Sequence, residues 1–162
     1  MKKLSVLVLM ILSGLLFAGE KVDNSNSDRD EVAKAIFLVC GTDSSDEEVI
    51  MIASVFKNRT KDKAIKNEPN MKASVKNFQA KVSITSVFKH KDLVNVADIL
   101  AAGGKVEDNV IMKRWELCWK YSTDWFKPTT PALLFSSVDD PYKTKVVKVA
   151  QTKHFLFYTR AD

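Results

Sequence analysis

The pattern of apolar residues changes from a helical to a strand period near Pro128 and Pro131, and this change constrains the fold most strongly. Before these prolines, apolar residues recur three and four positions apart, as on one face of a helix. After them, two short apolar runs (145–150 and 154–159) are joined by residues 151–153, which is typical of a β-hairpin. This order predicts an α+β fold, mostly helical, with a small antiparallel sheet at its C-terminal end.

Capping residues and apolar spacing predict four helices before the prolines. The first begins with a capping box from Asp28 to Glu31, and Gly41 ends it. Ser45 and Glu48 repeat the capping signature at the start of the second helix. The expected helices span residues 28–40, 45–59, 92–102 and 109–121, with a loop over 60–71 and no firm assignment for 75–88.

The first eighteen residues have the composition of a secretory signal peptide. A positive start precedes an uncharged run from Leu4 to Phe17, and the small residues Ala18 and Gly19 follow as a cleavage site. This run is shorter than the roughly 20 residues that a membrane-spanning helix needs, and an uncleaved membrane anchor is the alternative. We therefore expect an exported protein, periplasmic or extracellular. Its expected parts are a signal peptide over 1–18, a flexible lead over 19–27 and one domain over 28–162.

The charge of the chain is mildly basic and unevenly distributed. The net charge of +5 falls to +3 without Lys2 and Lys3. Ten of the basic residues lie between Lys57 and Lys91, where only two acids accompany them. A basic stretch often binds nucleic acid, but an exported protein rarely meets it, so no nucleic-acid partner is expected. An anionic wall polymer, a lipid surface and a merely solvated face remain open.

Two cysteines, Cys40 and Cys118, follow the signal-like segment. Outside the cytoplasm an even pair predicts a disulfide, which would stabilise the fold by roughly 3–5 kcal/mol. His90 and His154 could join the cysteines at a metal, but the close ligand spacings of metal sites are missing. We expect no metal and no cofactor.

Three groups of side chains could carry chemistry or binding. The acids of the loop between the first two helices could supply a general acid or could cap the second helix: Asp43, Asp46, Glu47 and Glu48. Four aromatic residues could stack on sugar rings or pack in the core: Trp115, Trp119, Trp125 and Phe126. His154 lies near Tyr158 on a strand and could form a site or be inert.

The order of several short motifs resembles the spore-cortex and cell-wall hydrolase family, whose members are lysozyme-like domains that cleave peptidoglycan. The second helix ends in an apolar run followed by Asn58-Arg59. In the middle segment Phe78-Gln79 takes the place of the family's aromatic-Gln pair, and Ile84-Thr85 stands where Phe-Ser or Phe-Thr is usual. The tail contains Leu133-Leu134-Phe135, a turn at Asp140-Pro141, and His154 before Phe157-Tyr158. The similarity extends from Glu31 to Arg160. It implies a lysozyme-like fold, with Thr85, Asp140 and Tyr158 placed to bind substrate.

The resemblance fails at the residue on which the family's activity depends. Counting back from Asn58-Arg59, the catalytic glutamate falls on Cys40. A thiol cannot protonate a glycosidic oxygen as a carboxylic acid does, and losing a general acid costs about 10²–10⁴ in rate. Asp43, Asp46 or Glu47 would then have to act as the catalytic acid, and Asp43 and Glu47 are the residues we predict for this role.

Two functions follow from this departure. The first is a protein that binds peptidoglycan or a wall-associated protein with little or no glycan cleavage, in which Cys40 has a structural role. The alternative is an active hydrolase that uses an acid of the loop 43–48. The sequence leaves open whether the protein is an enzyme, and an unrelated helical periplasmic protein is a third possibility.

Overall fold

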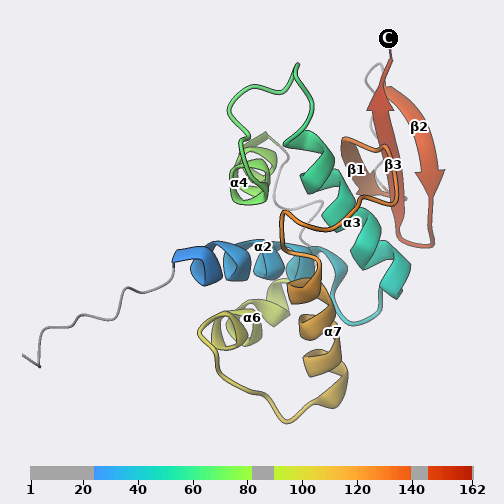
Figure 1. Cartoon of the computed structure of the whole chain (residues 1–162). Helices are drawn as coiled ribbons and strands as arrows, with labels where there is room; N and C mark the ends of the chain where they lie inside the picture. Colours follow the sequence, from blue (N-terminus) through green and yellow to red (C-terminus); the bar gives the residue numbers. More distant parts are fainter. Residues whose placement is uncertain (1–23, 82–89, 140–145, 162) are drawn as a thin grey trace, which may run out of the picture.

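The computed structural model describes residues 24–81, 90–139 and 146–161, and within them the fold is α+β (Figure 1). Five α-helices precede a three-stranded antiparallel sheet in these residues. The helices are α2 (Asn24–Cys40), α3 (Asp46–Arg59), α4 (Met71–Lys81), α6 (Val94–Ala101) and α7 (Asn109–Lys120), with a 3-10 turn η1 at Lys91–Leu93. The strands are β1 (Leu134–Ser137), β2 (Val146–Gln151) and β3 (Phe155–Arg160).

Helix α2 is the centre of the helical part. It contacts α3, α4, α6 and α7, and Figure 1 shows it crossing the middle of the molecule. Ile36, Phe37 and Cys40 are fully buried on it. Burial of such side chains contributes about 1.5–3 kcal/mol each, so α2 holds the other helices together. As predicted, Gly41 ends α2, with a φ of 60°, and the His90 ring occupies the space that a side chain at residue 41 would need.

The predicted capping box begins α3. The Glu48 backbone N–H donates to Ser45 Oγ at 3.2 Å, and the Ser45 N–H donates to the Glu48 carboxylate at 2.8 Å. These two bonds satisfy amide groups that have no partner within the helix.

The other end of α3 is fixed to the chain that leads into the sheet. The Asn58 side chain donates to the carbonyl oxygens of Thr130 and Ala132, at 2.6 and 3.0 Å. Arg59 donates to the Leu133 carbonyl and makes two bonds to the buried Glu68 carboxylate, at 2.9 and 2.5 Å. The Asn-Arg pair at the end of α3 therefore has a structural role here.

The sheet has the strand order β1-β3-β2, and β3 is its central strand. The predicted hairpin is formed by β2 and β3. Phe135 on β1 and Phe157 on β3 are register partners, and both are fully buried. The Phe135 ring stacks on Phe78 of α4 at a centroid distance of 4.7 Å and meets Phe56 of α3 edge-on. This aromatic cluster joins the sheet to the helices.

Two local features differ from the sequence expectations. Helix α2 begins at Asn24, four residues before the predicted start, so Asp28 is not its cap. Asp28 instead forms an ion pair with Lys72 at 2.6 Å. Residues 71–81 form α4, although its C-terminal part had no assignment. Burial of Met71, Val75 and Phe78 against neighbouring elements stabilises this helix.

No helix in the described ranges has the length and apolar character required to cross a membrane.

Candidate functional site

The acidic loop between α2 and α3 places its carboxylates in different environments. The Asp43 side chain is 62% exposed, and its Oδ1 lies 3.5 Å from His90 Nε2. Glu47 is exposed in the first turn of α3. Asp46 pairs with Arg114 of α7 at 3.3 Å. The two predicted catalytic acids, Asp43 and Glu47, therefore lie on the surface, where a carboxylate lacks the apolar surroundings that make a general acid.

Glu48 is the buried carboxylate of this region, with 1% exposure. Its Oε1 accepts from the His154 backbone N–H at 2.9 Å, and its Oε2 lies 3.0 Å from His154 Nδ1. The same carboxylate caps α3 through Ser45. Glu48 thus connects the start of α3 to the turn between β2 and β3.

The surroundings of Glu48 keep it ionised. Burial alone would raise its pKa, but hydrogen bonds from Thr152, from the His154 side chain and from the backbone of Ser45 and His154 lower it to about 2. A carboxyl group that is ionised at neutral pH has no proton to donate to a leaving group. Glu48 therefore acts as a structural anion and not as a general acid.

Cys40, at the position matched to the catalytic glutamate, is completely buried. Burial, followed by the proximity of Cys118, raises the pKa of its thiol well above the ordinary value, and burial raises that of Cys118 to about 12. Both cysteines point inward, as predicted, but the structure holds them as free thiols and lacks the predicted disulfide. Neither thiol is in the exposed, electropositive surroundings of a reactive cysteine.

Of the three predicted substrate-binding residues, the structure describes only Tyr158. Thr85 and Asp140 lie outside the described residues. Tyr158 is buried in β3, with 5% exposure, and its hydroxyl lies 3.3 Å from Ser136 Oγ. Tyr158 therefore has a packing position in the sheet.

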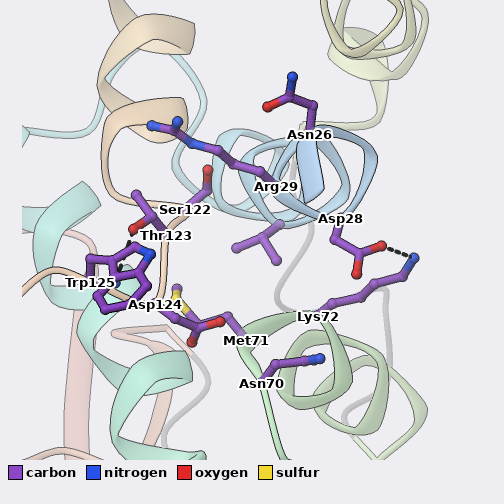
Figure 2. Close-up of a pocket in the computed structure, with 11 residues that line it drawn as sticks. Asn26, Asp28, Arg29, Asn70, Met71, Lys72, Ser122, Thr123, Asp124 and Trp125 are labelled. Carbon is purple, nitrogen blue, oxygen red and sulfur yellow. Dashed lines mark hydrogen bonds and ion pairs between the residues drawn. The ribbon is translucent and has the colours of Figure 1, made fainter. Parts of the chain in front are cut away.

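A pocket of about 390 Å³ lies at the opposite end of α2 from Cys40. The first turns of α2 and α4 and the residues 122–125 after α7 line it, as Figure 2 shows. Asp28 and Cys40 are twelve residues apart on α2, which corresponds to about 18 Å along a helix. The pocket is thus separate from the place where the family resemblance puts the catalytic residue.

Trp125 is the most conspicuous residue of this pocket because its side chain is 95% exposed. Its backbone N–H donates to Thr123 Oγ1 at 2.9 Å, which fixes the turn that presents the indole. The other candidate aromatics pack against the protein. Trp115 is buried, Trp119 lies under Arg29, and Phe126 meets Tyr121 edge-on. The sequence did not indicate that Trp125 differs from the other three aromatic residues, because the spacing of all four suits packing in the core as well as stacking on sugar rings.

Among residues 24–81, 90–139 and 146–161, no three His, Cys, Asp or Glu side chains are grouped so as to hold a metal ion. Compared with protein-family models, curated proteins and solved structures, the chain matches none of them. The similarity to cell-wall hydrolases therefore remains a prediction from short motifs.

Proposed function

We propose that this protein is exported and binds peptidoglycan, or a protein associated with the wall, without cleaving glycan. The observation that supports the absence of glycan cleavage is the burial of Cys40, which occupies the position matched to the catalytic glutamate. The motif resemblance and the signal-like first eighteen residues support the wall as the place of action.

The nearby acids support a binding protein over a hydrolase. Most glycoside hydrolases use one carboxyl group that is protonated and a second that is ionised, on either side of the bond to be cleaved. Glu48 is ionised and bound to His154, and Asp46 is paired with Arg114. Asp43 and Glu47 lie on the surface. No acid of this loop has the buried, apolar surroundings of a proton donor.

The test incubates the purified protein with isolated sacculi that retain their wall-associated proteins and measures two quantities. The proposal predicts that the protein sediments with sacculi and that the soluble fraction contains no released muropeptides. An active hydrolase that uses the acidic loop would release muropeptides, and Glu47→Gln or Asp43→Asn would stop the release. Release of muropeptides by the unaltered protein would overturn the proposal, and loss of that release in either substituted protein would assign the cleavage to the acidic loop.

A further inference from the structure

The pocket beside Trp125 has the form of a ligand site. It combines a cavity of about 390 Å³ with one aromatic side chain that is almost wholly exposed. Figure 2 shows Trp125 and the Asp28–Lys72 pair on opposite sides of the pocket. An aromatic ring at the edge of a polar pocket offers a flat apolar surface against which a ligand can be buried.

The charged side chains of the pocket are already paired within the protein. Lys72 Nζ lies 2.6 Å from Asp28 and 3.0 Å from Glu31. Asp124 accepts from Lys57 of α3 at 3.1 Å.

The guanidinium group of Arg29, the remaining cation, is also engaged. It stacks on the Trp119 ring at 3.1 Å from the centroid, and its Nε donates to the Trp119 carbonyl at 3.0 Å. The lining therefore carries two anions, Asp28 and Asp124, and two cations, Arg29 and Lys72, so it offers a charged ligand no net electrostatic attraction.

Neutral polar groups complete the lining. Asn70 uses its side-chain oxygen to cap α4, accepting from the Ala73 N–H at 2.9 Å. No hydrogen bond among residues 24–81, 90–139 and 146–161 uses the Asn70 amide nitrogen or the Asn26 side chain. Both amides therefore have N–H groups to offer a ligand, and Asn26 also has its carbonyl oxygen.

We propose that this pocket binds an uncharged sugar unit of the wall glycan. The sugar ring stacks on Trp125, and its hydroxyl or acetamido groups bond to Asn70. Because the pocket's own charges are paired, the preferred ligand is neutral and not an anionic polymer. This inference rests on the proposed function, since it names the part of the wall that the protein contacts.

The experiment titrates the full protein with two soluble sugars and follows tryptophan fluorescence. Chitotriose is the neutral probe, and a hyaluronan oligosaccharide is the anionic probe that carries the same acetamido sugar. We expect chitotriose to bind with a Kd that changes little between low and high salt, because no net charge is neutralised. We expect hyaluronan to bind at least several-fold more weakly.

Three variants test whether sugar binding depends on the Trp125 ring or changes with any substitution on the surface. Trp125→Ala should weaken chitotriose binding about tenfold or more, as truncation of an aromatic anchor does. Trp125→Phe retains a ring and should lose less. Val110→Ala changes an exposed apolar residue on α7 away from the pocket and should bind as the unaltered protein does. Since Trp125 is exposed, its replacement should leave thermal unfolding unchanged.

The outcomes distinguish this inference from the proposed function. If the protein sediments with sacculi and Trp125→Ala sediments equally well, the wall is bound elsewhere and the inference is wrong. Tighter binding of the anionic probe would also overturn it. If chitotriose binds through Trp125 while sacculi are not bound, the pocket assignment holds and the wall-binding function fails. Binding of neither sugar nor sacculi would overturn both.

Discussion

The carboxylate of Glu48 and the imidazole of His154 lie 3.0 Å apart although the two residues are 106 positions apart in the chain. Glu48 also closes the capping box of α3 with Ser45. One buried side chain therefore stabilises a helix start and joins that helix to the β2–β3 hairpin. A change at Glu48 affects both, whereas its neighbour Glu47 is exposed.

Glu48→Gln should lower the free energy of unfolding by about 2 kcal/mol. The amide keeps the shape of the side chain but weakens hydrogen bonds that a charged acceptor makes strong. Urea unfolding measures the change. Glu47→Gln is the matched control, one position away and exposed, and should change the stability by less than about 0.5 kcal/mol. Equal effects of the two substitutions would show that the contact with His154 contributes nothing.

The stability of the protein should depend on pH through Glu48. Its pKa of about 2 in the folded state lies below the ordinary 4.5, so the unfolded chain binds the proton more readily. The stabilisation is therefore fully present above the unfolded pKa and is lost as the pH falls from about 5 towards 2. Over this range the unaltered protein should lose about 3 kcal/mol more than Glu48→Gln. If the free energies of unfolding of the two proteins change in parallel with pH, the ionisation of Glu48 does not contribute to the pH dependence of stability.

Glu68→Ala should destabilise the protein by about 3–5 kcal/mol, because it leaves the buried Arg59 guanidinium without its partner. Asp62→Ala is the comparison, since Asp62 pairs with Arg160 at 3.7 Å in a partly exposed position. It should cost less than about 1 kcal/mol. Thermal or urea unfolding of both variants measures the two losses of stability. A small effect at Glu68 would mean that the loop between α3 and α4 does not depend on this pair.

Cys40 and Cys118 should resist alkylation in the folded protein, because both thiols are buried and their pKa values are raised. In urea without reductant, both should react with iodoacetamide, and the intact mass should increase by two adducts. If neither thiol reacts in urea until a reductant is added, Cys40 and Cys118 form the disulfide predicted from the sequence, and the free thiols described above are wrong.

The sequence predicted the elements whose signals are local. Ser45 and Glu48 formed the expected capping box, and Gly41 ended α2 as its conformational freedom suggested. Helix α4 was not assigned in full because its stability comes from burial of Phe78 and its neighbours, which no local pattern reveals. The start of α2 was placed too late because Asp28, a typical cap, pairs with Lys72 instead.

The candidate site was less accessible to sequence reasoning. Glu48 was placed among the acids of the loop, but its partner His154 is too distant in the chain for any spacing rule to connect them. Trp125 was one of four aromatic candidates, and only three-dimensional packing shows that it alone of the four is almost wholly exposed. Cys40 was correctly expected to point inward, because its spacing places it on the apolar face of α2.

We propose that the protein binds the wall and does not cleave its glycan. The most direct measurement incubates the purified protein with sacculi, sediments them, and determines both the bound protein and the soluble muropeptides. We expect protein in the pellet and no muropeptides above a control without protein. Muropeptides in the supernatant, or protein that stays entirely in solution, would contradict it.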